Sequence, residues 1–141
     1  MNGKKIYMIK NIDIKKLGLN SPLDKWFISL VNKQIEELSV LDISRMLRQE
    51  IFPDIAMPVT FERLMENPFE GEMYDGQLLE LYIRCLSKYP VYEEREKYIY
   101  LCAIASKNID LYDWADEYSK QEYKKVLNKL EMLTKITGDY S

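Results

Sequence analysis

The sequence predicts an all-α fold, a single-domain bundle of about five to seven helices with an N-terminal arm. Apolar residues recur at helical spacing in most segments, and helix-start patterns precede several of these segments. Five glycines and five prolines in 141 residues leave little material for a turn-rich β-sandwich. Hydrophobic residues make up 47% of the chain, which is enough to bury a sizeable core in one ordinary domain.

The first twenty residues follow the helical pattern least well. Residues 5–14 are apolar without a clear helical period, so we expect an extended arm or a strand there. We assign residues 1–20 to an N-terminal arm and residues 21–141 to the helical domain. Residues 1–10 lack the apolar stretch and cleavage site of a signal peptide, and no window approaches the roughly 18 apolar residues of a membrane-spanning helix.

Capping patterns mark the first two helices. Ser21 followed by Pro22 predicts a cap and the first helical residue. The apolar stripe after this start is Leu23, Trp26, Phe27, Leu30 and Val31. Residues 39–42 read Ser-Val-Leu-Asp, an acidic variant of the capping box. The helix that it opens has the apolar positions Val40, Ile43, Leu47 and Ile51.

Proline and turn residues divide the middle of the chain. Pro53 and Pro58 predict a turn or short helix at residues 52–57 and a separate helix at residues 59–66, which ends before Asn67. Asp75 is expected to cap the next helix, because it follows a turn-rich stretch and precedes an apolar stripe. The inward residues of that helix are Leu78, Leu81, Tyr82, Cys85 and Leu86.

Two more helices complete the prediction. The first lies at residues 94–105, with inward residues Tyr98, Leu101, Cys102 and Ala105. Residues 119–122, Ser-Lys-Gln-Glu, form a second capping box that opens the last helix. The inward stripe of the last helix is Tyr123, Val126, Leu127, Leu130 and Leu133.

The absence of histidine excludes several classes of enzyme site, among them Ser-His-Asp and Cys-His catalysis and histidine metal sites. Cys85 and Cys102 are too few for a four-thiolate zinc site. We expect both to be small buried hydrophobes in a reducing cytosol, although a disulfide between them stays open as an alternative. The cytoplasm is therefore the expected compartment.

Two carboxylate pairs at helical spacing are candidates for acid/base or metal sites. Glu62 and Glu66 form one pair, and Asp113 and Glu117 form the other. No dense loop of oxygen ligands accompanies them, and no glycine-rich phosphate loop is present. We interpret both pairs as exposed helix charges and expect no catalytic residues, no metal, no cofactor and no enzyme activity.

Charge is distributed unevenly along the chain. Residues 1–33 carry seven lysines against two acidic residues, whereas residues 34–96 carry fourteen acidic residues against six basic ones. The net charge of −3 argues against nucleic acid as a direct partner. The acidic middle segment is either a face that docks a basic partner or an ordinary solvated helical surface.

A second acidic group follows at residues 110–118. Its acidic residues are Asp110, Asp113, Asp116 and Glu117, and its aromatic residues are Tyr112, Trp114 and Tyr118. Aromatic side chains beside carboxylates are typical of a protein interface. Core packing and helix capping are the alternative explanation of the same residues.

Two motifs carry a family resemblance. Residues 42–49 read Asp-Ile-Ser-Arg-Met-Leu-Arg-Gln, and residues 67–79 read Asn-Pro-Phe-Glu-Gly-Glu-Met-Tyr-Asp-Gly-Gln-Leu-Leu. In combination they resemble the helical immunity proteins of contact-dependent growth inhibition and related polymorphic-toxin systems. The family usually has an acidic residue before Leu78, where this chain has Gln77.

The resemblance implies a cytoplasmic bacterial protein that binds the C-terminal toxin domain of its cognate effector and blocks the active site or the substrate path. If the toxin is a nuclease, its cleft is basic and an acidic inhibitor face suits it. We expect no membrane partner, and the sequence does not decide between monomer and dimer. The alternative function is a helical adaptor or regulatory binding protein of a mobile element.

The residues of the two motifs are interpreted as scaffold that sets turn geometry and internal contacts. These residues are Arg45, Arg48, Gln49, Asn67, Pro68, Gly71 and Gly76. Toxin binding is expected instead from acidic and aromatic residues near the 67–76 loop and in the 110–118 group. The predicted toxin-binding residues are Glu70, Glu72, Tyr74, Asp113 and Glu117.

Overall fold

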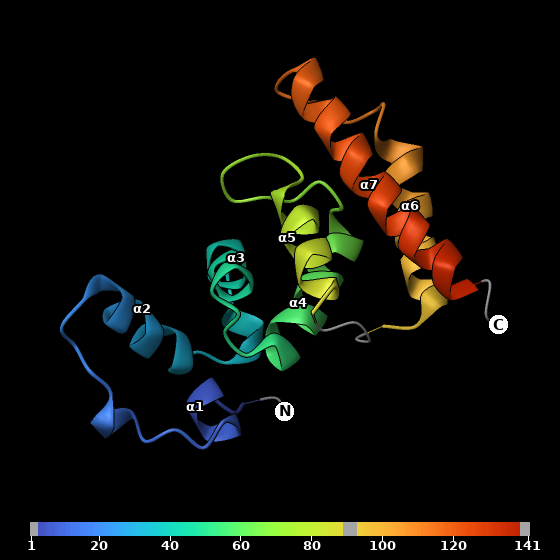
Figure 1. Ribbon diagram of the computed structural model, residues 1–141. Coiled ribbons are helices and arrows are strands. Elements are labelled where there is room, and N and C mark those ends of the chain that lie inside the picture. Colours follow the sequence, from blue (N-terminus) through green and yellow to red (C-terminus); the bar gives the residue numbers. More distant parts are fainter. Residues whose placement is uncertain (1–2, 89–92, 139–141) are drawn as a thin grey trace. The chain divides into compact units, whose positions relative to one another are not determined.

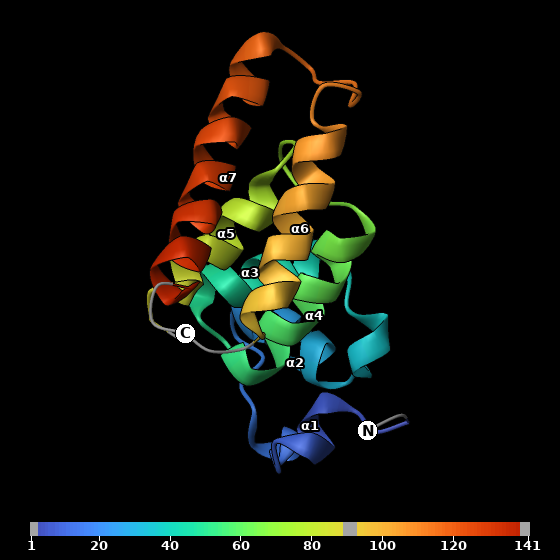
Figure 2. The same ribbon diagram turned by 90° about the vertical axis from the view of Figure 1, so that its right-hand side faces the viewer.

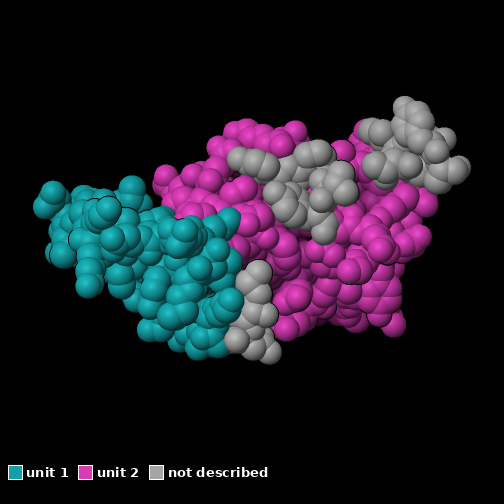
Figure 3. All heavy atoms as spheres, turned by 90° about the horizontal axis from the view of Figure 1, so that it is seen from below, with its two compact units in different colours: residues 1–42 teal, residues 43–141 magenta. Residues whose placement is uncertain are grey.

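The computed structural model describes residues 3–88 and 93–138 (Figure 1). Within these ranges the chain forms seven α-helices, two short 3-10 helices and no strand, and Lys5 and Gln34 form an isolated antiparallel bridge. The predicted all-α class is confirmed. The chain divides into two compact units, residues 1–42 and residues 43–141 (Figure 3).

The first unit begins with α1 (Ile6–Ile9) and η1 (Ile14–Lys16) and continues with α2 (Pro22–Val31) and η2 (Ile35–Glu37). Residues 5–14 do not form a strand, because the chain passes from extended geometry at Lys5 directly into the single turn of α1. The amide of Ile6 donates to the carbonyl of Lys33 at 2.9 Å, and the Ile6 side chain is fully buried. This tertiary anchor, rather than a periodic pattern, sets the local structure.

Both predicted N-terminal caps of this unit are confirmed. Ser21 Oγ accepts the backbone N–H of Asp24 at 3.1 Å, with Pro22 as the first residue of α2. At the start of α3 (Val40–Gln49), Asp42 N–H donates to Ser39 Oγ at 3.1 Å and Ser39 N–H donates to Asp42 Oδ2 at 3.0 Å. This reciprocal pair is a capping box with aspartate as its acidic member.

Asp42 is also the centre of a charged network in the first unit. Its carboxylate is 4% exposed, lies 2.6 Å from Lys33 Nζ, and accepts Trp26 Nε1–H at 3.3 Å. Burial alone raises the pKa of Asp42, but the hydrogen bonds from Lys33 and Ser39 outweigh this effect and hold the pKa below its usual value. The carboxylate is therefore stabilised in its charged form.

The second unit contains the rest of α3 together with α4 (Pro53–Glu66), α5 (Gln77–Leu86), α6 (Arg95–Asn108) and α7 (Glu117–Gly138). Helices α6 and α7 pack side by side in opposite directions, joined by the 109–116 segment, and α5 packs against both α4 and α7 (Figure 2). All the inward residues predicted for α5 and α6 are buried. In α7, Tyr123, Leu127 and Leu130 are buried, whereas Leu133 is 40% exposed.

The predicted break at Pro58 is wrong, because α4 runs without interruption from Pro53 to Glu66. Pro53 occupies the first helical turn, where a missing N–H removes no helical hydrogen bond. Pro58 removes only the bond to the carbonyl four residues earlier, and burial of the residues around it, including Met57, Val59 and Phe61, offsets that loss. Tertiary packing thus overrides the local signal.

Two predicted caps are also wrong. Helix α5 begins after Gly76, whose left-handed backbone (φ 85°) makes the turn, and no side chain caps its first amides. Helix α7 begins at Glu117, two residues before the predicted box, because Asp116 Oδ1 accepts the backbone N–H of Ser119 at 2.7 Å. Ser119 therefore lies inside the first turn of α7.

Candidate functional site

The loop at residues 67–76 is held by its own side chains and backbone. Asn67 Oδ1 accepts the amide of Phe69 at 3.0 Å, and Asn67 Nδ2 donates to Glu70 Oε2 at 3.2 Å. The amide of Gly76 donates back to the carbonyl of Phe69 at 2.7 Å, which closes the loop before α5. This arrangement is an Asx turn followed by a tight return of the chain.

Two glycines allow this path. A Cβ atom at Gly71 would collide with the carbonyl oxygen of Tyr74, so no other residue fits at this position without movement of the backbone. Gly76 combines a φ of 85° with a close approach to the ring of Tyr123. A side chain at Gly76 would meet both backbone strain and that ring.

The side chain of Gln77 holds the backbone of Glu72 and Met73 in the loop. Its side chain is 5% exposed, and its Oε1 accepts the backbone N–H groups of Glu72 at 3.1 Å and Met73 at 2.9 Å. An amide oxygen fills this role as a carboxylate oxygen would. Arg48 holds the same part of the loop through Glu72 Oε2 at 3.4 Å. The other two α3 motif residues, Arg45 and Gln49, are half-buried and exposed, respectively.

An aromatic cluster joins this loop to the 109–116 segment and to α7. The ring of Phe69 lies 4.6 Å from Tyr112, 5.2 Å from Trp114 and 5.1 Å from Tyr123, measured between ring centroids. Tyr123 donates its hydroxyl to the carbonyl of Pro68 at 2.7 Å. The 67–76 loop and the 109–116 segment, about 40 positions apart in the chain, therefore pack against each other through this aromatic cluster.

The hydroxyl of Tyr112 makes a second link by donating to Asp75 Oδ1 at 2.8 Å. Burial, this hydrogen bond and the nearby carboxylates of Asp75, Glu70 and Asp113 raise the pKa of Tyr112 to about 12. Asp75, which the sequence predicts as a helix cap, thus ties the loop to the neighbouring segment instead. Its carboxylate also contributes to a locally negative field.

The structure brings together the two groups of predicted toxin-binding residues. Of the acids in the second group, Asp110 pairs with Lys120 at 2.8 Å and Asp116 caps α7. Asp113 and Glu117 are exposed and have no cation within 4 Å in the part of the chain that the structure describes. We use the name acidic face for the surface formed by Glu70, Glu72, Tyr74, Asp75, Asp113 and Glu117.

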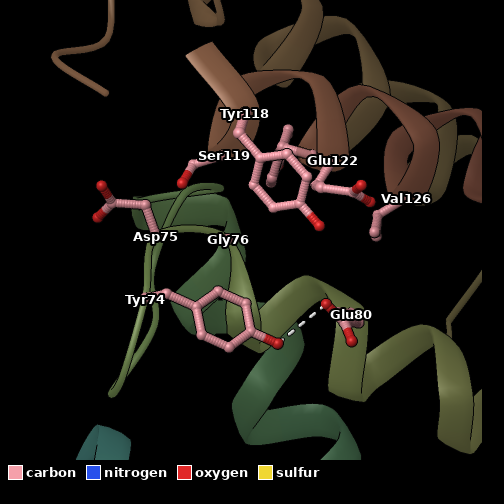
Figure 4. Close-up of a pocket in the computed structure, with 9 residues that line it drawn as sticks. Tyr74, Asp75, Gly76, Glu80, Tyr118, Ser119, Glu122 and Val126 are labelled. Atoms are coloured by element: carbon pink, nitrogen blue, oxygen red, sulfur yellow. Dashed lines mark hydrogen bonds between the residues drawn. The ribbon is translucent and has the colours of Figure 1, made fainter. Parts of the chain in front are cut away.

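A cavity of about 420 Å³ opens beside the acidic face (Figure 4). One wall comes from the loop and the first turn of α5, and the other comes from the first turns of α7. We call this cavity the tyrosine pocket and define it by Tyr74, Asp75, Glu80, Tyr118, Glu122 and Tyr123. No basic residue is among the described residues that line it.

Comparison with protein-family models gives one match that covers more than half of the chain. A family model of CDI (contact-dependent growth inhibition) immunity proteins matches residues 8–98 of the chain, from α1 to the first turn of α6. The chain belongs to the CDI immunity protein family. The match extends beyond both sequence motifs, which lie at residues 42–49 and 67–79. A comparison with curated proteins gives no match.

In this immunity protein, sequence reasoning assigned neither Glu80 nor Glu122 to a binding site, and it named Tyr118 only as one aromatic residue of the 110–118 group. Glu80 and Glu122 are half-buried and Tyr118 is 73% exposed. The signal for Tyr118 was its position beside carboxylates, which is typical of a protein interface. No local pattern places Glu80 opposite Glu122, because α5 and α7 meet only in the folded chain.

Cys85 and Cys102 are buried and free, and burial raises the pKa of the Cys102 thiol to about 11. Among the described residues, no cluster of three or more acidic or cysteine side chains is arranged to hold a metal ion. No helix within residues 3–88 and 93–138 is long and apolar enough to span a bilayer.

Proposed function

We propose that this CDI immunity protein neutralises its cognate toxin domain by binding it through the acidic face, as a cytoplasmic inhibitor with no chemistry of its own. Family membership supports the immunity role. The observation that supports this surface is the convergence of the 67–76 loop and the 110–118 segment, which join two acidic groups separated in the sequence. Inhibition then requires only that the complex cover the toxin's active site or substrate path.

The charge of this surface favours a basic toxin. Asp113 and Glu117 are exposed, and the neighbouring Asp75 carboxylate accepts the neutral hydroxyl of Tyr112. A nuclease holds phosphates in a basic cleft, so an acidic inhibitor competes for the same electrostatic field. Complementary charge raises the association rate and penalises non-cognate partners.

Exposed apolar side chains next to the acidic face supply binding area. Met73 is 72% exposed, Tyr74 49%, Leu111 80% and Tyr118 73%. Met and Tyr are enriched in the centres of protein interfaces, where acidic residues at the rim orient the partner. A standard interface of roughly 1,600 Å² in total requires both kinds of surface.

The test is co-purification with the toxin domain encoded beside this chain, followed by affinity measurement on a charge-reversed variant. We expect Asp113→Lys combined with Glu117→Lys to weaken binding roughly ten- to hundredfold at low salt. The matched control reverses Glu62 and Glu96, which are exposed acids on α4 and in the first turn of α6.

The control changes the net charge by the same amount, so it separates the effect of the acidic face on affinity from the effect of net charge alone. Equal affinity of the Asp113/Glu117 variant and the control would overturn the acidic face as the binding surface. Failure of the wild-type protein to bind the toxin or to protect cells that express it would overturn the proposed function itself.

A further inference from the structure

We propose that the tyrosine pocket receives an arginine side chain of the toxin, with the guanidinium between Tyr74 and Tyr118 and paired with Glu80 and Glu122. This inference rests on the proposed function and names the chemical group that the site recognises. It starts from the shape of the site, a cavity of about 420 Å³ rather than a flat acidic surface. A volume of this size accommodates a long side chain with room for water.

The two tyrosines provide aromatic walls from opposite sides. Figure 4 shows Tyr74 coming from the loop and Tyr118 from α7, with their rings on opposite sides of the cavity. Tyr74 is 49% exposed and Tyr118 is 73% exposed, so both residues are accessible to a partner. A planar cation between two aromatic rings gains cation–π attraction on both faces.

The carboxylates complete a recognition site for a cation. Glu80 on α5 and Glu122 on α7 line one side of the pocket, and Asp75 lies on the opposite side (Figure 4). Glu80 accepts the hydroxyl of Tyr74 at 3.0 Å, which fixes the aromatic wall relative to the charge. Burial, the hydrogen bond to Glu80 and the negative charge of Glu80 raise the pKa of Tyr74, so the phenol stays neutral.

The cations already near these carboxylates do not neutralise the pocket. Arg84 lies 3.8 Å from Glu80 one turn along α5, and Lys125 lies 3.3 Å from Glu122 along α7. Both basic side chains are more than 60% exposed. Exposed pairs of this kind contribute little, and an incoming cation replaces them readily.

Arginine fits this arrangement better than lysine does. The guanidinium is planar, so it stacks between two rings while its edge donates in the plane to carboxylates on either side. An ammonium group is compact and more strongly hydrated, and it gains less from stacking. A basic nuclease surface offers arginines at the positions where it holds phosphates.

The first experiment uses the immunity protein alone with N-acetyl-arginine amide as the probe. We expect two-dimensional amide spectra to shift at Gly76 and Ser119, which line the pocket, at tens of millimolar probe. The neutral N-acetyl-norleucine amide should leave these signals unchanged. Equal shifts in the Tyr118→Ala variant, or no shifts with the arginine probe, would overturn the proposal.

The second experiment measures affinity for the toxin domain. We expect Tyr118→Ala to weaken binding roughly tenfold and Glu80→Gln with Glu122→Gln to weaken it by a similar factor. The matched control is Tyr100→Ala, because Tyr100 is 60% exposed on α6 outside the pocket. A toxin arginine whose replacement by alanine shows no further loss in the Tyr118→Ala background identifies the occupant.

The two proposals fail in different ways. If charge reversal at Asp113 and Glu117 weakens toxin binding but Tyr118→Ala does not, the acidic face stands and the arginine pocket is wrong. If the toxin does not bind the wild-type protein at all, the proposed function fails, and the probe experiment still decides whether the pocket selects arginine.

Discussion

The hydroxyl of Tyr123 donates to the carbonyl of Pro68 across 55 positions of the chain, at 2.7 Å. This buried bond ties the first turns of α7 to the start of the 67–76 loop, and Tyr123 is 3% exposed. Replacing Tyr123 by phenylalanine leaves the Pro68 carbonyl without its donor, which should lower the free energy of unfolding by about 1.5 kcal/mol. Urea denaturation measures this change.

Tyr100→Phe is the control for that variant, because Tyr100 is 60% exposed. Its effect should stay within about 0.5 kcal/mol of zero. If both variants unfold at the same urea concentration, the Tyr123–Pro68 bond does not stabilise the loop.

The glycine at position 76 should be nearly irreplaceable. Gly76→Ala adds a left-handed strain and forces the new methyl group against the Tyr123 ring, with an expected loss of about 3 kcal/mol. Gly3→Ala has the same positive φ but nothing within 4 Å of the new Cβ, so its loss should be about 1 kcal/mol. Thermal unfolding of the two variants separates strain from collision, and equal melting temperatures would contradict the collision.

Stability at acid pH should depend on Asp42. Its folded-state pKa is depressed, so its contribution is complete above the unfolded value of about 3.9 and is lost as the pH falls through the lower folded value. Asp42→Asn should lower stability at pH 7 by about 2 kcal/mol and make the acid limb less steep. Chemical denaturation across this pH range, with exposed Glu62→Gln as control, tests it; parallel pH profiles of wild type and Asp42→Asn would refute it.

Association with the toxin should be electrostatically steered. Raising the salt concentration should slow the association rate of the wild-type protein, because screening weakens the field of the acidic face. In the variant with Asp113→Lys and Glu117→Lys, the association rate should be lower and its salt dependence smaller. Stopped-flow mixing measures both rates; a change confined to the dissociation rate would argue against steering.

The two thiols should be inert in the folded protein. Cys85 and Cys102 are buried, and burial raises the pKa of both groups, to about 11 for Cys102. Because the thiolate is the reactive form, a thiol-specific chromogenic disulfide should react only as fast as the chain opens. Rapid reaction of both thiols in native buffer, at the rate seen in urea, would contradict the buried positions.

The parts of the fold that the sequence predicts correctly are those set by neighbours in the chain. Ser21 and the Ser39–Asp42 pair cap helices because their partners lie three residues away. The helix break predicted at Pro58 is wrong because burial around α4 outweighs one lost hydrogen bond. The cap predicted at Ser119 is wrong because Asp116, three residues earlier, accepts the amide of Ser119 and caps α7 instead.

The candidate site was predictable in its components and not in its assembly. Acidic and aromatic side chains at Glu70, Tyr74 and Asp113 are visible in the sequence. Their convergence depends on Phe69 packing against Tyr112 and Trp114, a contact between distant segments with no local pattern. The tyrosine pocket is missed for the same reason, since one wall belongs to the loop and α5 and the other belongs to α7.

The two walls of the tyrosine pocket have different structural freedom. The loop wall depends on Gly71 and Gly76, whose backbone paths tolerate no side chain, and it lies within the residues that match the family. The opposite wall carries Tyr118 and Glu122 on α7, beyond that match, while the buried Tyr123, Leu127 and Leu130 anchor the helix inward. If the toxin binds at this pocket as we propose, substitutions in α7 after gene duplication would change which toxin is bound while the loop stays unchanged.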